Sequence, residues 1–132
     1  MKGIDLLVEI CTRDDLMSTQ SMWNAAVEDL KAHGEDGSRA LARLLEEMLA
    51  CRADTLGPVI AAAGKVLSTP ELVAALESIE RATPLAPARS PARFRPQIAG
   101  GGQIGWTDGK AKILKELAAA SLKALGGSQP GG

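Results

Sequence analysis

Apolar residues recur at helical spacing through the first 82 positions of the chain. The clearest stripe lies in "SRALARLLEEMLACRAD", where large apolar residues return every three to four positions. This spacing predicts a series of amphipathic helices, although the short run over 3–11 also leaves a strand open. The five predicted apolar faces are Ile4, Leu7, Val8 and Cys11; Leu16, Trp23, Val27 and Leu30; Leu41, Leu44, Leu45, Met48 and Leu49; Leu56, Val59, Ile60, Ala63 and Leu67; and Leu72, Val73, Leu76 and Ile79.

Two sequence signals mark helix starts. Thr69 is an N-cap residue, followed by Pro70 at the first helical position and Glu71 in the first turn. Thr12 and Asp15 have the spacing of a capping box, with Asp in place of the usual Glu. We expect helices to begin after both threonines.

The predicted helices are joined by short connections. Gly34 is expected to close the second helix, with His33 near its negative end, and Ser38 or Asp36 to cap the third. Pro58 fits the first turn of the fourth helix. Because short connections place consecutive helices antiparallel, residues 1–82 predict an up-and-down bundle of about five short helices. A solenoid-like stack of helical hairpins is the alternative, although no fixed repeat supports it.

The helical pattern stops at Thr83 and resumes near Thr107. Residues 83–106 are rich in Pro, Gly and Arg, which favours an extended arm or linker. Residues 107–126 predict a C-terminal helix, and 127–132 a disordered tail. The expected apolar side of the C-terminal helix is Ile113, Leu114, Leu117 and Leu125.

Composition supports an all-α class. Apolar residues make up 45% of the chain, yet there is one Phe and no Tyr. Alanine is abundant, and small side chains allow helices to pack closely, whereas sheets draw on aromatic and β-branched residues. A core built this way is thin. We therefore expect the C-terminal helix to pack back onto the bundle, a partner chain to cover it, or both.

Charge divides the chain into two unlike halves. Residues 1–82 carry a net charge of −6, and residues 83–132 carry +5. Such a division indicates that the second half meets an anionic partner. That partner can be the acidic half of the same chain or of a neighbouring one.

The remaining sequence features favour a cytoplasmic protein. Cys11 and Cys51 fall on predicted apolar faces and form neither a disulfide framework nor a metal motif. The beginning of the chain lacks the apolar run of a signal peptide, and no segment is long enough to span a membrane.

Residues for catalysis are scarce. His33 is predicted to be a helix-end residue. Adjacent Glu46 and Glu47 point in different directions on a helix, so they are not expected to form a catalytic pair. The "GGGQIG" stretch lacks the strand and the Lys-Ser/Thr of a phosphate loop. We therefore predict no enzymatic activity, no catalytic residue, no metal site and no cofactor.

The arm is the candidate binding region, because it interleaves arginines with large apolar residues. We predict a non-catalytic adaptor or regulatory protein that binds another protein through the arm and C-terminal helix, with a homodimer also open. The runner-up is an accessory nucleic-acid binder, and a small enzyme, for which no residue set can be nominated, comes third. For the arm itself, a plain solvated linker is the other interpretation. The protein-binding residues are predicted to be Arg89, Arg93, Phe94, Arg95, Ile104 and Trp106. The nucleic-acid alternative would use Arg89, Arg93, Arg95, Lys110 and Lys112.

Overall fold

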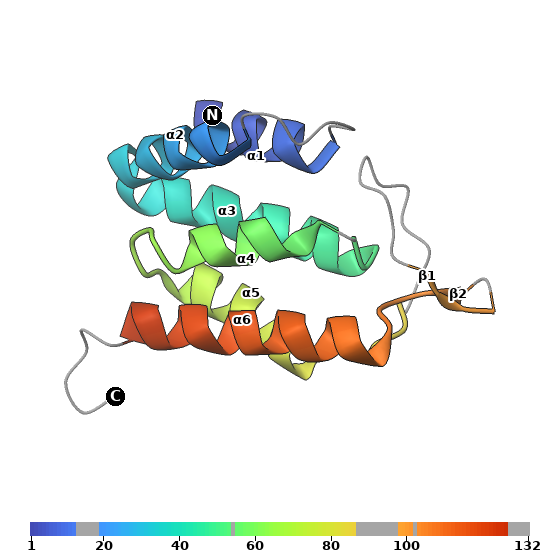
Figure 1. The fold of residues 1–132 in the computed structure, drawn as a ribbon. Helices are drawn as coiled ribbons and strands as arrows, with labels where there is room; N and C mark the ends of the chain where they lie inside the picture. Colours follow the sequence, from blue (N-terminus) through green and yellow to red (C-terminus); the bar gives the residue numbers. More distant parts are fainter. Residues whose placement is uncertain (13–18, 54, 87–97, 102, 127–132) are drawn as a thin grey trace.

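The chain folds into a helical bundle, as its apolar pattern predicts (Figure 1). The computed structural model describes residues 1–12, 19–53, 55–86, 98–101 and 103–126. Within them lie the helices α1 (Lys2–Thr12), α2 (Thr19–Ala32), α3 (Gly34–Ala50), α4 (Leu56–Ala63), α5 (Pro70–Arg81) and α6 (Asp108–Gly126), and the strands β1 (Ile98–Gly100) and β2 (Gln103–Ile104). The predicted capping partner Asp15, the apolar position Leu16 and the tail 127–132 lie outside the described residues.

Helix α3 lies at the centre of the bundle (Figure 1). It packs against α2 on one side and against α4 and α5 on the other, while α1 packs mainly against α2. The C-terminal helix α6 returns and packs against α4 and α5. Its return confirms the expectation that the last helix completes the core of the bundle.

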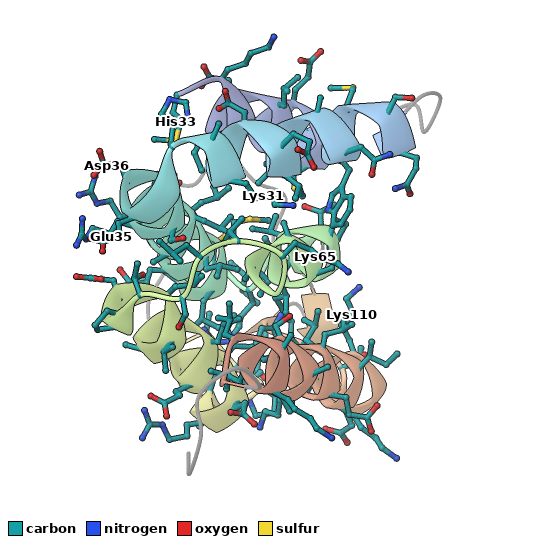
Figure 2. The ribbon with its side chains drawn as sticks, turned by 90° about the vertical axis from the view of Figure 1, so that its left-hand side faces the viewer. Lys31, His33, Glu35, Asp36, Lys65 and Lys110 are labelled. Atoms are coloured by element: carbon teal, nitrogen blue, oxygen red, sulfur yellow. The ribbon has the colours of Figure 1, made fainter. Side chains whose placement is uncertain are left out.

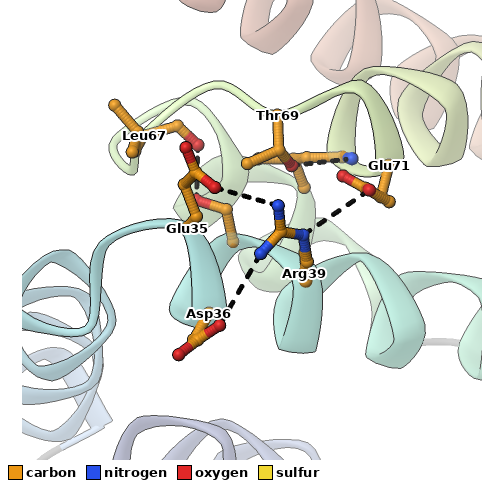
Figure 3. Close-up of polar contacts among 8 residues, drawn as sticks. Glu35, Asp36, Arg39, Leu67, Thr69 and Glu71 are labelled. Atoms are coloured by element: carbon orange, nitrogen blue, oxygen red, sulfur yellow. Dashed lines mark hydrogen bonds and ion pairs between the residues drawn. The ribbon is translucent and has the colours of Figure 1, made fainter.

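The start of α5 is capped by Thr69 of the preceding turn and is linked to α3 by Arg39 (Figure 3). Thr69 caps α5 by accepting a 3.2 Å hydrogen bond from the amide of Leu72, and Pro70 opens the helix, as predicted. On the facing surface, the Arg39 guanidinium lies 2.9 Å from Glu35, 3.6 Å from Asp36 and 3.5 Å from Glu71. Arg39 therefore links the first turns of α3 and α5.

The predicted cap of α3 at Ser38 or Asp36 is wrong. The helix begins earlier, at Gly34, whose φ of +57° turns the chain directly out of α2. A side chain at Gly37 would collide with the Leu30 carbonyl, so this glycine allows α2 and α3 to approach closely. Ser38 is buried inside α3, and its hydroxyl donates to the carbonyl of Leu67.

Two predicted apolar positions do not face the core. Leu67 is 51% exposed, because α4 ends at Ala63 and Leu67 lies in the following turn. Ile113 is 55% exposed, because small residues set how α6 packs on α4. At that contact the buried Ser121 hydroxyl donates to the Ile60 carbonyl over 2.8 Å. The buried positions of α6 are Ala111, Leu114, Ala118, Ser121 and Leu125.

The core combines the predicted stripes with one residue of the arm. Both cysteines are buried in the hydrophobic core, which confirms their interpretation as core residues. Trp106 joins them at the end of the arm. The large side chains that are fully buried are Leu7, Leu30, Leu41, Leu45, Met48, Leu56, Ile60, Leu72, Leu76, Ile79, Trp106 and Leu114.

Candidate protein-docking site

Helix α3 ends in a Schellman motif that has an arginine where glycine is usual. The Arg52 amide donates to the Leu49 carbonyl over 3.0 Å, and the Ala53 amide donates to the Met48 carbonyl over 2.9 Å. Arg52 has a φ of 50°, in the left-handed region that costs a side-chain-bearing residue energy. Despite its charge, Arg52 is only 4% exposed. The end of α3 thus holds a buried guanidinium.

Backbone carbonyls surround this guanidinium. Nε and Nη2 of Arg52 donate to the Thr83 carbonyl over 3.1 and 2.9 Å, and Nη2 also reaches the Leu85 carbonyl at 3.3 Å. Nη1 donates to the Leu49 carbonyl over 2.5 Å. Leu49 is near the end of α3 and Thr83 follows the end of α5, so the cation lies where two helix dipoles are negative. Burial lowers the pKa of Arg52 from its ordinary value, but an arginine stays charged at neutral pH.

Trp106 forms the other half of this site. Its ring is 1% exposed and lies 5.1 Å from Cζ of Arg52, within the range of a cation–π contact. Its Nε1 is buried and has no hydrogen-bond partner among the residues that the structure describes. The backbone amide of Trp106 donates to the Pro84 carbonyl over 2.7 Å. The side chain of Trp106, through Arg52, and its backbone, through Pro84, thus both attach the end of the arm to its beginning.

Backbone pairing completes this attachment. The Ala86 amide donates to the Ile104 carbonyl over 2.9 Å, and Leu85 forms an antiparallel bridge with Gly105. A Cβ on Gly105 would lie 2.5 Å from the Pro84 carbonyl oxygen, so the two segments approach too closely for a side chain. We call the group of Arg52, Thr83, Leu85 and Trp106 the arm anchor.

The arm anchor holds both ends of the predicted arm. On the far side of β2, Ile98 pairs with Ile104 in an antiparallel, two-stranded sheet with an irregular register. Residues 86 and 98 are therefore both attached through β2, and the sequence between them begins and returns at one place on the bundle. Within the described residues, the two ends of the predicted arm are thus paired with each other.

The predicted binding residues fall into two groups. Trp106 is buried in the arm anchor, and Ile104 is half-buried in β2. The structure thus brings these two together at the base of the arm. The other four predicted residues lie outside the described residues: Arg89, Arg93, Phe94 and Arg95. Their binding role stays a prediction.

Sequence reasoning missed Arg52. It follows the strongest apolar stripe in the chain, with no glycine nearby to end the helix. That absence is the one available signal, because many helices end with a residue in the left-handed conformation and here no glycine is present to adopt it. Nothing in the sequence indicates that its partners would be the carbonyls of Thr83 and Leu85.

No group of three or more His, Cys, Asp or Glu side chains among the described residues is placed to hold a metal ion. Burial raises the pKa of the Cys51 thiol, which favours the unreactive protonated form. The His33 ring lies 2.8 Å from the Asp29 carbonyl at the end of α2, as expected of a helix-end residue.

A shallow apolar groove lies away from the arm anchor, between α1, α2 and α4. It has a volume of about 310 Å³ and is lined mainly by Ile10, Trp23, Pro58 and Ala61. The Trp23 indole donates to the Pro58 carbonyl over 2.9 Å, which fixes this wall of the groove. None of the described residues that line the groove is charged, so none of them offers an ionic contact that would orient a small ligand.

Across the described helices, none is both long enough and apolar enough to cross a bilayer. Comparison of the chain with protein-family models, with curated proteins and with solved structures finds no match. Its function is therefore argued from its own residues.

Proposed function

We propose that this chain is a non-catalytic adaptor or regulatory protein that binds another protein through its arm and α6. The observation that carries the proposal is the pairing beside the arm anchor, in which residues 86 and 98 are both attached to Ile104 of β2. A binding segment held at both ends loses less chain entropy on association than a free tail. The segment between these ends supplies Arg89, Arg93, Phe94 and Arg95.

The residue types of the arm support a protein partner. Arginine and aromatic side chains dominate the energetics of protein interfaces. Leu85, at the beginning of the arm, is 44% exposed and adds apolar surface beside the segment. Trp106 takes a different role in this proposal, because it stabilises the base of the arm.

The proposal places the protein in the cytoplasm. Cys11 and Cys51 are buried and form no disulfide with each other, which agrees with a compartment that keeps thiols reduced.

The test is quantitative capture of a stoichiometric partner by the full chain after cross-linking. We expect the double substitution Arg93→Ala and Phe94→Ala to abolish capture while the circular dichroism spectrum stays unchanged. Arg81→Ala is the matched control, since this exposed arginine lies on α5, outside the arm. Equal capture by the wild type and the arm variant would reject the proposal. A Trp106 variant is unsuitable, because it removes a core side chain.

The nucleic-acid alternative keeps one supporting feature. Lys110 and Lys112 lie in the first turns of α6, directly after the arm. However, Figure 2 shows Glu35 and Asp36 on one side of the view and Lys65 and Lys110 on the other, so charges of both signs are spread over the bundle. Binding to single-stranded RNA or DNA that falls steeply with salt and is lost on Arg93→Ala would favour this alternative.

A further inference from the structure

Helix α1 lies at the edge of the bundle (Figure 1). It packs mainly against α2 and only slightly against α3, whereas α3 packs against helices on both of its sides. The buried residues of α1 are Gly3, Leu7 and Cys11, and Leu7 is the one large apolar side chain among them. The partly buried apolar residues of α1 are Ile4, Leu6, Val8 and Ile10. Most large apolar side chains of α1 are therefore only partly covered.

Hollows adjoin both flanks of α1. The groove of about 310 Å³ lies beside Ile10, between the end of α1 and α4. A second hollow, of about 260 Å³, lies between the beginning of α1 and α3. Met1 and Ile4 line it on one side, and Arg43 and Leu44 line it on the other. Close packing, which resists displacement of a helix, is thus interrupted on both flanks of α1.

The contact that α1 makes with α2 depends on Gly3. A Cβ at this position would lie 2.8 Å from the Ala26 carbonyl oxygen and 2.9 Å from Cγ of Leu30, so this approach requires glycine. The Gly3 amide also donates to the Asp29 carboxylate over 2.7 Å, which satisfies one of the amides that the first turn of a helix leaves unpaired. One small residue thus controls how closely α1 docks.

The end of α1 is attached by longer contacts. The Cys11 thiol lies 3.6 Å from the Thr55 carbonyl oxygen, and the Thr55 hydroxyl lies 3.5 Å from the Cys11 carbonyl oxygen. Both distances are long for hydrogen bonds, and a thiol is a weak donor. These two contacts are therefore weaker than the hydrogen bond of the Gly3 amide.

We propose that α1 is a displaceable helix, which undocks from α2 as a unit while α2 to α6 stay folded. Its departure uncovers the apolar surface that α1 covers, which includes Ala26 and Leu30 of α2. An isolated helix of 11 residues is only marginally stable in water, so α1 unwinds once it undocks. This conformational device belongs to α1 and α2 and does not rest on the proposed role of the arm.

The uncovered surface fits a partner helix with the pattern of α1. The buried line of α1 is small, large and small, with Gly3, Leu7 and Cys11 four residues apart. Because a Cβ at the first position collides with Ala26, a competing helix needs glycine there and a large apolar residue one turn later. The partner is therefore an amphipathic helix with this line. Its affinity for the full chain is set by the fraction of molecules in which α1 is undocked.

Native-state hydrogen exchange of the full chain, followed by NMR, tests the undocking. We expect the amides of α1 to open at least about tenfold more often than those of α3. Alanine favours a helix more than glycine does, yet at Gly3 its Cβ collides with α2. Gly3→Ala should therefore speed exchange in α1 about tenfold, as an undocking helix requires. Fraying of α1 in place would instead be slowed by alanine.

Two further variants support this measurement. Asp29→Ala removes the carboxylate that pairs with the first turn of α1 and adds no bulk, so it should also speed exchange in α1. Gly109→Ala is the matched control, because a Cβ in this first turn of α6 meets open space. It should leave exchange in α1 unchanged. Circular dichroism confirms that each variant is folded.

A peptide experiment tests the occupant. The probe is a synthetic, fluorescently labelled peptide of residues 1–12, titrated with the full chain and followed by anisotropy. Gly3→Ala in the full chain should tighten binding about tenfold, because it raises the fraction of molecules in which α1 is undocked. The same substitution in the peptide should weaken binding about tenfold, because the collision then falls on the probe. A peptide of the same residues in scrambled order is the control.

Four results would overturn the proposal. Two come from exchange: α1 amides that open no more often than those of α3, and exchange in α1 that Gly3→Ala slows. Two come from the peptide: no binding to the Gly3→Ala chain, and a scrambled peptide that binds as tightly as the α1 peptide. The double arm substitution of Arg93 and Phe94 should change neither measurement, even though capture of the other protein is lost.

Discussion

The helices of the bundle and the arm anchor are held together by different kinds of contact. The bundle relies on many similar apolar residues, which recur along each of the helices from α1 to α6 and are buried where these helices pack together. The arm anchor relies on single residues, mainly Arg52 and Trp106, and on carbonyl groups of the backbone. Several residues of a stripe share its burial, whereas the arm anchor has no second arginine or tryptophan among its described contacts.

The largest expected effect tests whether the arm contributes to the core. Trp106→Ala removes a side chain that is 1% exposed, and we expect the free energy of unfolding to fall by about 3–5 kcal/mol. Urea denaturation followed by circular dichroism measures it. Ile113→Ala, at an exposed position, is the control and should change stability by less than about 0.5 kcal/mol. A loss no larger than this control would contradict the assignment of Trp106 to the core.

The second prediction separates the backbone and side-chain roles of Arg52. Arg52→Ala leaves the buried carbonyls of Thr83 and Leu85 without their donor, so we expect a loss of about 2–4 kcal/mol. Arg52→Gly loses the same hydrogen bonds but relieves the backbone at φ 50°. It should therefore be about 1 kcal/mol more stable than the alanine variant. The reverse order of the two variants in urea denaturation would argue against the left-handed turn.

A helix cap within the bundle gives a smaller effect. Thr69→Ala removes the acceptor for the Leu72 amide at the start of α5, and the expected loss is about 1 kcal/mol. Thr69→Ser retains the acceptor oxygen and should keep most of the stability. Thermal unfolding of both variants checks this, and equal melting temperatures for the two would count against the cap.

The smallest effect concerns the exposed ion pair between α3 and α5. A hydrogen bond from its own backbone amide, with Arg39 nearby, lowers the pKa of Glu71 below its ordinary value. The Glu71 carboxylate therefore binds a proton less readily in the folded chain than in the unfolded chain. The contribution of Glu71 to the free energy of unfolding is therefore fully present above the ordinary pKa of glutamate. It is lost as the pH falls through the lowered pKa of the folded chain. NMR titration of the carboxyl group should show that Arg39→Met raises the pKa only in part, because the amide hydrogen bond remains.

The contrast between the helical bundle and the arm anchor also explains which parts of the structure the sequence could predict. Helical spacing identified the stripes of α3 and α5, and Thr69 with Pro70 marked the start of α5 correctly. The start of α3 was misplaced, because Gly34 and Gly37 act through the close approach of α2, which has no periodic signature. Ile113 was assigned to the wrong side, because alanines and Ser121 set the packing of α6.

The candidate site was less predictable than the fold. Composition drew attention to the arm and to Trp106, but not to Arg52. The partners of Arg52 are carbonyl groups, which every residue carries, so no residue type identifies them in advance. The antiparallel pairing of Leu85 with Gly105 likewise depends on where α5 and α6 end in space.

The arm anchor joins residues on both sides of the arm. Because of this, we expect α6 to stay docked on the bundle even when the polypeptide chain is interrupted within the arm. All the described contacts of α6 with α4 and α5 lie outside residues 87–97. In terms of assembly, we expect residues 1–86 and 98–126 to behave as two complementary fragments of one fold. The segment between them is thus a suitable place for new chain termini in a circular permutant, or for an inserted reporter domain.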